Sequence, residues 1–283
     1  MLSYQHAFHA GNHADVIKHL TWLGVIHCLK RKNKPFTLYD THSGAGVYNL
    51  NEDEASKNKE YESGISKLAD LSPQSPLLTH YLSLCASYRS HNSYPGSPAL
   101  SAAELRDGDT LHAMELHPAE YGKLASSIKR ISSHVTHCHH RDGYEGLKAL
   151  TPPKPNRGAV LIDPPYERLE EYNDVTNAVT MLLNRWQQAH IVIWYPLLSE
   201  RAAKKSGASE AMVSQLAALN RPCFTVEVRV EDNTHDAGMY GSGVVVINPP
   251  WQLDSIVEKA IDEVVPTLGQ YVSSEIVWHN EDT

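Results

Sequence analysis

Short apolar runs, rich in Val, Ile and Thr and separated by segments with helical spacing, recur along this chain of 283 residues. A run without polar alternation is typical of a strand that is covered on both faces. Strands of this kind that alternate with helices predict an α/β fold with a doubly wound sheet. The seven predicted strands are residues 36–39, 110–116, 135–138, 159–162, 191–194, 224–230 and 244–247.

The stretch between the first two predicted strands breaks this pattern. From 77 to 88 the apolar residues keep helical spacing, and prolines precede them. We therefore predict a helical insertion at residues 47–93, between two parts of one α/β domain at residues 1–46 and 94–283. A further helix is predicted at residues 14–31, where apolar residues recur every three or four positions.

The net charge of −8, taken by itself, disfavours a nucleic-acid partner. The distribution of charge along the chain changes that expectation. Residues 1–50 carry five bases against two acids, with six of the 17 histidines, whereas residues 231–283 carry ten acids against Lys259 alone. The N-terminal segment is therefore a basic, histidine-rich surface that can contact phosphate locally, with a solvated helix surface as the alternative for residues 30–34.

Four cysteines lie more than fifty residues apart, without a Cys-x-x-Cys pair. This usage predicts reduced thiols and a cytoplasmic protein rather than a disulfide framework or a cysteine zinc site. No apolar run approaches the roughly 18 residues of a membrane span, and the polar N-terminus does not resemble a signal peptide. His9 and His13 have the spacing of metal ligands on a helix, but no carboxylate or cysteine nearby in the sequence completes a set, so we expect no metal.

The first predicted strand runs into Asp40 and a Gly-x-Gly turn at Gly44 and Gly46, which lets the backbone approach a ligand closely. Asn49 stands where a dinucleotide fingerprint needs glycine or alanine, which argues against a nicotinamide dehydrogenase. Glu115 lies near the end of the second strand, and a carboxylate there can accept both hydroxyls of a ribose. Acids at two strand ends therefore favour a nucleoside ligand, with a turn cap as the alternative role for Glu115.

An acid also follows the third predicted strand, where Asp142 precedes Gly143. Its carboxylate can accept a hydrogen bond from the exocyclic amine of an adenine. An Asp-Gly pair is most often only a turn, so ligand contact and turn formation both stay open for this position.

The fourth predicted strand ends in the string Asp-Pro-Pro-Tyr at residues 163–166, which resembles the signature of S-adenosylmethionine-dependent methyltransferases that modify exocyclic amino groups of adenine. Asp163 can accept one N–H of such an amine and the carbonyl of Pro164 the other, which orients the nitrogen lone pair toward a methyl donor. Tyr166 can supply a face on which the extruded base stacks. A purely structural Asp-Pro-Pro turn is the alternative.

A second string, Asn-Pro-Pro-Trp at residues 248–251, matches a relaxed form of the same signature. Strand order decides between the two strings, because the amine-binding motif belongs on the fourth strand and residues 248–251 follow the seventh. We therefore interpret the second string as a structural turn.

Five strings together closely resemble the RlmJ family of bacterial 23S ribosomal RNA adenine-N6 methyltransferases. They are residues 4–19, 40–46, 94–98, 115–118 and 163–166, and the first of them is more specific than Asp-Pro-Pro-Tyr. The resemblance runs over nearly the whole chain. It implies a Rossmann-like class I methyltransferase with a seven-stranded sheet and a small helical insertion, with S-adenosyl-L-methionine as cofactor and 23S rRNA as partner.

The resemblance also implies roles for individual residues. Asp163 is implied as the catalytic acceptor of the target amine in a direct methyl transfer. Tyr4 is implied as a contact to the RNA, and His6 and Lys18 lie in the same matching string and are predicted to assist at the target base or phosphate. The implied contacts to S-adenosylmethionine are His19, His42, Ser97, Glu115, Asp142, Gly143 and Asp163.

Two other functions stay open on the sequence: DNA adenine-N6 methylation, which shares the four-residue motif, and a non-catalytic RNA-binding module on the same scaffold. The sequence shows no basic recognition helix of a duplex-DNA reader. We expect a monomer with a small RNA footprint on one face and a shallow salt dependence of binding. The glycines within residues 236–243 suggest a mobile loop near the site, and we hypothesise that it orders when RNA binds.

Overall fold

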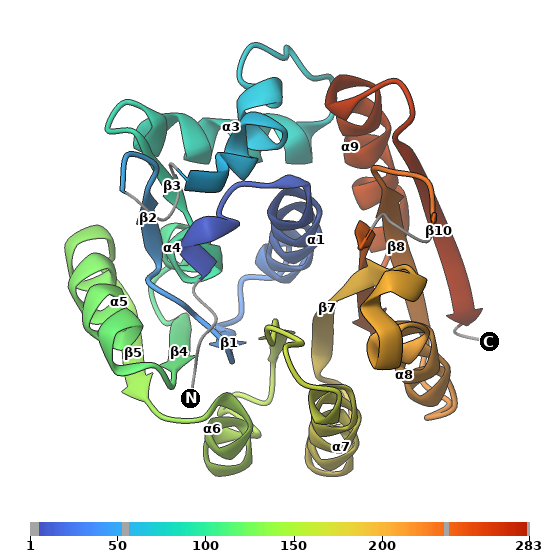
Figure 1. Ribbon diagram of the computed structural model, residues 1–283. Coiled ribbons are helices and arrows are strands. Elements are labelled where there is room, and N and C mark those ends of the chain that lie inside the picture. Colours follow the sequence, from blue (N-terminus) through green and yellow to red (C-terminus); the bar gives the residue numbers. More distant parts are fainter. Residues whose placement is uncertain (1–5, 53–56, 235–237, 282–283) are drawn as a thin grey trace.

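The structure is a computed structural model that describes residues 6–52, 57–234 and 238–281. Within these residues, a mixed sheet of eight strands in the order β10-β8-β9-β7-β6-β1-β4-β5 forms the centre of the molecule (Figure 1). This arrangement confirms the predicted α/β fold. The strands are β1 (Thr37–Asp40), β4 (Thr110–Glu115), β5 (Val135–His140), β6 (Gly158–Ile162), β7 (His190–Leu198), β8 (Cys223–Arg229), β9 (Met239–Ile247) and β10 (Ser273–Asn280).

Five neighbouring strands, from β5 through β4, β1 and β6 to β7, run parallel. β9 runs antiparallel between β7 and β8, and β10 pairs antiparallel with β8. The carboxyl ends of β1, β4, β5 and β6 therefore lie side by side along one edge, where open α/β sheets bind their ligands. We call this the carboxyl edge of the sheet and the opposite one the amino edge.

The central sheet has eight strands rather than the predicted seven. β10 was not predicted, because this strand lacks the continuous apolar run of the others. Its residues alternate between exposed and half-buried positions. Ile276 and Trp278 pack against the core, whereas Val277 between them is exposed. An outermost strand with one covered face carries no continuous apolar run, so the criterion that identified the buried strands missed β10.

Helices cover both faces of the sheet (Figure 1). One face carries α1 (His13–Lys30), α4 (Ser97–Glu104), α5 (Pro118–Ile131) and α9 (Leu253–Leu268), with α3 (Pro76–Arg89) packed against α1 and α9. The other face carries α6 (Gly143–Leu150), α7 (Glu170–Arg185) and α8 (Ala208–Ala217). Two short 3-10 helices, η1 (His6–Phe8) and η4 (Glu200–Lys205), precede α1 and α8.

The helix predicted at residues 14–31 is α1, and fifteen of its 18 residues are buried. An almost uniformly buried helix needs cover on all sides, which the sheet, α3, α4 and α9 provide. The helix begins at the carboxyl edge, where Asn12 accepts a hydrogen bond from the backbone N–H of Asp15. It ends with Lys30 at the amino edge, where Arg157 donates to the carbonyl of Leu29 just before β6. The two ends of α1 therefore serve opposite edges of the sheet.

The segment at residues 47–93 contains η2 (Glu60–Glu62), η3 (Ile65–Leu68) and α3, in agreement with its helical spacing. At its two ends, β2 (Val47–Asn49) and β3 (Ser93–Pro95) pair antiparallel. Neither strand was predicted, because three residues are too few to show a period. The division of the chain into an insertion and a main domain stays a prediction.

Two of the three glycines interpreted as a mobile loop, Gly241 and Gly243, serve close packing instead, whereas a Cβ on Gly238 would meet nothing within 4 Å. Residues 235–237 lie outside the described residues, whereas Gly241 and Gly243 lie within β9. A Cβ on Gly243 would lie 2.2 Å from the ring of Tyr195, and one on Gly241 would lie 2.4 Å from the carbonyl oxygen of Val228. Neighbouring groups approach β9 so closely that neither position has room for a side chain.

The four cysteines are free thiols. Burial raises the pKa of each thiol above its ordinary value, which keeps all four protonated and unreactive at neutral pH. Among the residues that the structure describes, no helix combines the length and the apolar character needed to cross a membrane.

Gly143 begins α6 next to the end of β1, and it has no room for a side chain. A Cβ at this position would lie 2.2 Å from the carbonyl oxygen of Thr41. We expect Gly143→Ala to lower the free energy of unfolding by about 1 to 3 kcal/mol, because backbone atoms must move apart. Gly122→Ala is the matched control, since an added Cβ at this exposed position of α5 meets nothing within 4 Å. It should raise the free energy of unfolding by up to about 1 kcal/mol. Urea denaturation measures the free energy of unfolding of both variants. Equal values for the two variants would contradict the close approach of Gly143 to Thr41.

Candidate active site

A cavity with a volume of about 660 Å³ opens at the carboxyl edge of the sheet. Its walls come from the segments after β1, β4, β5 and β6, from the N-terminal part of α1 and from the start of α4. We call it the first cavity. Its volume is that of a typical site for a cofactor or another small molecule.

The structure brings most of the predicted site residues together from distant parts of the chain. Tyr4 lies outside the described residues, and Tyr166 lines a different cavity. The predicted residues that line the first cavity are His6, Lys18, His19, His42, Ser97, Glu115, Asp142, Gly143 and Asp163.

The charged centre of this cavity is a buried cluster in which Lys18 bridges two carboxylates. Its Nζ lies 2.5 Å from Oδ2 of Asp163 and 2.8 Å from Oδ1 of Asp15. Burial opposes the charge of the ammonium group, but the two carboxylates outweigh it and raise the pKa of Lys18 above its ordinary value. Lys18 is therefore a permanent cation that links α1 to the loop after β6, 145 positions along the chain.

Asp15 anchors this cluster, a role that the sequence analysis missed. Its buried side chain accepts a hydrogen bond of 2.8 Å from the backbone N–H of Gly11 and lies 3.0 Å from Nε2 of His6. Burial alone would raise the pKa of Asp15, but His6, Lys18 and His19 hold it well below its ordinary value. The signal in the sequence was an acid three positions before Lys18 in a predicted helix, a spacing that places both side chains on one face.

Asp40, at the end of β1, lies behind Ser97 and is completely buried. Its Oδ2 accepts a hydrogen bond of 2.6 Å from the Ser97 hydroxyl, whereas Oδ1 has no partner among the described residues. Burial raises the pKa of Asp40 to about 6, and the charge of Asp163 adds to the effect. A buried, charged carboxyl oxygen without a donor is costly, which agrees with the preference of Asp40 for its neutral form.

Glu115, at the end of β4, is held by two backbone groups. The N–H of Gly44 donates to Oε2 at 2.8 Å, and the N–H of His117 donates to Oε1 at 2.6 Å. Gly44 has a φ of +55°, and a Cβ there would lie 2.1 Å from the hydroxyl oxygen of Tyr48, so the turn requires glycine. Burial raises the pKa of Glu115. Each carboxylate oxygen can accept more than one hydrogen bond, so Glu115 can still bind the hydroxyls of a ribose.

Asp142 caps the N-terminus of α6. Of the two roles that the sequence left open for this residue, the structure therefore shows the one in a turn. Its Oδ1 accepts hydrogen bonds from the backbone N–H groups of Tyr144 and Glu145 at 2.9 and 3.0 Å. Its Oδ2 has no protein partner within the described part of the chain, and the residue lines the cavity, which leaves this oxygen for a ligand. His42 lies beside it, packed edge-on against Tyr144, and burial lowers its pKa to about 4, so its ring is neutral at pH 7.

His19 lines the first cavity and belongs to a buried network of side chains that extends behind it. Its Nδ1 lies 2.8 Å from the hydroxyl of Tyr94, which in turn lies 2.8 Å from the hydroxyl of Tyr81. Burial lowers the pKa of His19 to about 3, so the ring is neutral. The network joins α1 to α3 and β3, and it fixes the wall of the cavity next to Lys18.

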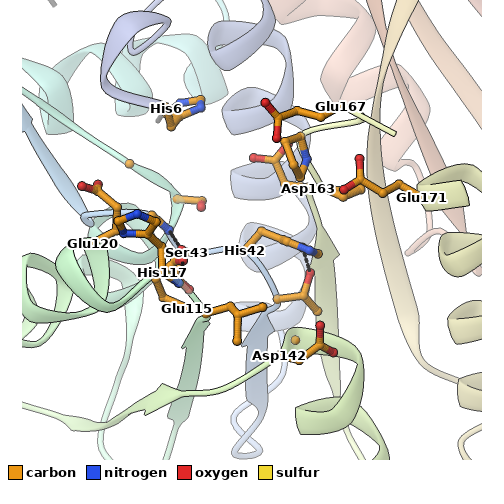
Figure 2. A pocket seen from close by; sticks show the side chains of 18 of the residues that line it. His6, His42, Ser43, Glu115, His117, Glu120, Asp142, Asp163, Glu167 and Glu171 are labelled. Atoms are coloured by element: carbon orange, nitrogen blue, oxygen red, sulfur yellow. Dashed lines mark hydrogen bonds between the residues drawn. The ribbon is translucent and has the colours of Figure 1, made fainter. Parts of the chain in front are cut away.

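Carboxylates dominate the rim of the first cavity. Figure 2 shows Glu115 and Glu120 on one side, Asp163, Glu167 and Glu171 on the opposite side, and Asp142 at the bottom of the view. A rim of this charge attracts a small cation and repels phosphate. The first cavity is therefore suited to a positively charged small molecule rather than to a nucleic-acid backbone.

A second cavity of about 660 Å³ adjoins the first at the Lys18–Asp163 pair. His6, Lys18 and Asp163 line both cavities. The lining of the second cavity also includes Lys67 and Lys205. Asp163 is therefore accessible to one ligand in each cavity.

The ring of Tyr166 is buried, so the stacking face predicted from the sequence is not presented to a ligand in this structure. Its ring packs against Tyr172 at a centroid distance of 4.5 Å, and its hydroxyl donates to the carbonyl of Trp194 at 2.8 Å.

A different aromatic residue, Tyr271, lines the second cavity and is 85% exposed. This residue carried no signal in the sequence beyond being an aromatic residue in a turn.

The histidines near the N-terminus take part in hydrogen bonds between segments. Nδ1 of His9 lies 2.9 Å from Oε1 of Glu60, and Asn12 donates to Oε2 of the same carboxylate at 2.9 Å. The hydrogen bond with Glu60 raises the pKa of His9. No group of three or more His, Cys, Asp or Glu that could hold a metal ion occurs in residues 6–52, 57–234 and 238–281.

The strand order, the acidic groups at the strand ends and the cavity between them are those of a methyltransferase-like α/β fold. A family model described as Ribosomal RNA large subunit methyltransferase D, RlmJ, matches residues 33–280. The chain therefore belongs to the RlmJ family of ribosomal RNA large subunit methyltransferases, and it is an enzyme.

Individual relatives agree with this assignment. The chain is 36% identical over 272 residues to Ribosomal RNA large subunit methyltransferase J of Escherichia coli (strain K12), with 95% of this chain and 93% of that protein covered. It is also 36% identical over 274 residues to the Haemophilus influenzae protein of the same name, with 95% and 94% covered. The crystal structure of protein LPL1258 from Legionella pneumophila matches with a TM-score of 0.84 at 29% identity, covering 95% of this chain and 98% of that one.

The raised pKa of Asp40 makes the stability of the protein depend on pH. The pKa is about 6 in the folded state, against an ordinary value of 3.8. Between these pH values the folded state binds more protons than the unfolded state, so the free energy of unfolding falls as the pH rises. Asp40→Asn does not titrate, so the wild-type free energy of unfolding should fall relative to this variant by up to about 3 kcal/mol between pH 4 and pH 7.

Urea denaturation of both proteins across this pH range measures the difference. Asp262→Asn, at an exposed position of α9, is the matched control and should keep a constant offset from the wild type. A constant offset for Asp40→Asn as well would contradict the effect of burial on this carboxyl group.

Proposed function

We propose that this enzyme transfers a methyl group from S-adenosyl-L-methionine to the N6 amino group of an adenine in 23S rRNA. The observation that carries the proposal is the position of Asp163, which lines both cavities and is held by Lys18. In this proposal the first cavity binds the cofactor and the second receives the extruded adenine. The names of the Escherichia coli and Haemophilus influenzae relatives support ribosomal RNA of the large subunit as the substrate.

The residues of the first cavity fit S-adenosylmethionine, which supplies an electrophilic methyl group on a positively charged sulfur when it is bound. Glu115 would accept hydrogen bonds from the ribose hydroxyls, and Oδ2 of Asp142 would accept one from the adenine amine. The acidic rim suits the positive charges of this molecule. The volume and the electrostatics of the cavity therefore agree with the predicted cofactor.

Asp163 would orient the target amine. Its Oδ2 is bound to Lys18, and its Oδ1 has no protein partner in the described residues, so Oδ1 can accept one N–H of the amine. The carbonyl of Pro164 can accept the other, because a proline loop presents carbonyl groups without competing N–H groups. With both N–H groups held, the lone pair of N6 is directed toward the methyl donor.

The buried cluster would also stabilise the charge that develops during transfer. Lys18, Asp15 and Asp163 together carry a net charge of −1 when all three are ionised, and they lie in a site with little access to water. The nitrogen becomes positive as it gains the methyl group, and fixed negative charge nearby lowers the energy of this state. The amine then loses a proton, and Oδ1 of Asp163 is the adjacent acceptor.

The second cavity offers the contacts that an RNA strand needs. Lys67 donates to the carbonyl of Leu268 and Lys205 donates to the carbonyl of Tyr166 at 3.1 Å. Each ammonium group has three donors, so both lysines can also bind phosphate. The exposed ring of Tyr271 provides an aromatic surface for a base near the target. The RNA would therefore enter from the second cavity, away from the acidic rim.

Asp163→Asn tests the assigned role of this carboxylate. The variant keeps the size of the side chain but loses the charge, so the amine is held less well and its developing charge is less stabilised. We expect kcat to fall by about 100-fold or more, with binding of S-adenosylmethionine changed only a few-fold. Calorimetry with the cofactor and a radiolabel assay with an rRNA hairpin measure the two effects.

Asp262→Asn on α9 removes the same charge at an exposed position and serves as the control for this assay. It should keep wild-type turnover. Wild-type kcat in Asp163→Asn would exclude Asp163 as the acceptor of the amine. Loss of cofactor binding in the same variant would assign Asp163 to the cofactor site alone.

The nature of the nucleic acid can be tested with matched hairpins of the same sequence, one of RNA and one of DNA. We expect N6-methyladenine to form in the RNA hairpin at least about tenfold faster, because the proposed substrate is a single-stranded or looped RNA segment. Mass spectrometry of the digested products identifies the modified base. Preferential methylation of the DNA hairpin would support the alternative of a DNA adenine methyltransferase, and no methylation of either would contradict the proposed reaction.

A further inference from the structure

Two features of the sequence have no part in the proposed reaction, and the fold brings them together at the amino edge of the sheet. One is the basic run that follows α1, and the other is the Asn-Pro-Pro-Trp turn at residues 248–251. Nη1 of Arg31 donates to the carbonyl of Trp251 at 3.2 Å, although 220 positions separate the two residues. The turn reaches this edge because β9 runs antiparallel to β7, so that Ile247 pairs with Ile191 near the start of β7.

The turn that carries Trp251 is held firmly in place. The side-chain amide of Asn248 donates to the carbonyls of Gln187 and Ala189 at 2.9 and 3.0 Å. The backbone N–H of Asn248 donates to the carbonyl of Pro222 at 2.8 Å. These bonds confirm the interpretation of this string as a structural turn, but they do not explain its last residue. Trp251 is 80% exposed, and such exposure of the largest apolar side chain is unusual in a protein surface without a partner.

Several bases lie next to the turn that carries the exposed indole. Arg31, Lys32 and Lys34 are all exposed. Arg157 lies beneath them and donates to the carbonyl of Lys34 at 2.6 Å. We call Trp251 together with these four bases the Trp251 surface. It is locally basic in a chain with a net charge of −8.

Two further contacts show that these charges lie close together. Arg106 donates to the carbonyls of Lys32 and Lys34, both at 3.2 Å, and its own charge is paired with the buried Asp109. Burial lowers the pKa of His190, and the charges of Arg157 and Lys32 lower it further. The ring of His190 contacts the carbonyl of Asn248, so the bases and the tryptophan turn form one continuous surface.

The chemistry of this surface matches a single-stranded segment of RNA. An exposed aromatic ring stacks on a base of any sequence, and adjacent Lys and Arg side chains bind the phosphates on either side. Resting on the proposed function, which makes RNA the substrate, we propose that the Trp251 surface binds a second, unpaired segment of the same rRNA. A base stacks on Trp251, and Lys32 and Lys34 contact the flanking phosphates.

The surface is separate from the active site. Arg31 follows Lys18 by thirteen positions along α1, which correspond to about 20 Å at 1.5 Å per residue. A short hairpin that reaches the second cavity with its loop need not contact the Trp251 surface, whereas a longer fragment with the neighbouring helices of the rRNA can contact both. The surface therefore contributes to affinity for the long fragment and not to the chemical step.

The test compares binding of a long 23S rRNA fragment, by filter binding at several salt concentrations, among variants of the Trp251 surface. We expect Trp251→Ala to raise Kd about fivefold or more, and Trp251→Phe to recover most of the loss because it keeps an aromatic ring. The double variant Lys32→Ala/Lys34→Ala should also raise Kd and reduce the slope of log K against log salt by about 1.4, as expected for two lost phosphate contacts to a single strand.

Lys129→Ala/Arg130→Ala is the matched control, because it removes the same charge from exposed positions near the end of α5. It should bind the long fragment as the wild type does, and turnover on a short hairpin should be unchanged in every variant. Wild-type Kd in Trp251→Ala and in the double lysine variant would overturn the proposal. Unchanged RNA binding with an altered sedimentation of Trp251→Ala would also overturn it, in favour of an interface between protein chains.

These outcomes are independent of the proposed reaction, because binding is measured without cofactor. If the wild-type protein forms no N6-methyladenine, and the Trp251 variants bind RNA more weakly than the wild type, only the proposed function is contradicted. Normal methylation together with unchanged RNA affinity in the variants would contradict only the Trp251 surface.

Discussion

The buried ion cluster of Asp15, Lys18 and Asp163 is the interaction on which the rest of the site depends. Charges in a protein interior are stable only when they are paired, and the loss of one partner leaves the others uncompensated. This requirement fixes the start of α1 against the loop after β6, and it holds one oxygen of Asp163 while the other stays accessible. The two cavities meet at this pair, so the same contact that stabilises the fold also decides where a cofactor and a base would face each other.

The distribution of charge reconciles a net charge of −8 with an RNA substrate. The carboxylates around the first cavity favour a small cation and disfavour phosphate. The second cavity is more mixed, with three lysines beside four carboxylates, and further bases follow α1 at the amino edge. α1 connects these regions, because its first turns carry the ion cluster and its last residue leads into the basic run. The basic N-terminal segment recognised in the sequence is therefore not one surface. It is divided between two edges of the sheet.

Much of the site could be predicted because parallel strands bring their carboxyl ends to one edge, and the acids near the ends of β1, β4, β5 and β6 follow that rule. The predictions that differed from the structure share a different cause. β10 has one covered face and no continuous apolar run, so it was missed. Gly241 and Gly243 lie inside β9, where neighbouring groups leave no room for a Cβ, and this need for space cannot be read from the glycines alone. Tyr166 turns its ring into the core, which depends on the packing of Tyr172 and Trp194 around it.

The sequence by itself determined the kinds of element and the chemistry at their ends, because the period of apolar residues and the acids after each run are local properties of a few consecutive residues. Its family resemblance extended this to a cofactor and a substrate class. Only the tertiary structure decided which distant residues become partners: Lys18 with Asp163 across 145 positions, and Arg31 with Trp251 across 220. Such pairs are set by strand order, by strand direction and by the way α1 crosses the sheet, and these emerge from the packing of the whole chain rather than from any one segment of it.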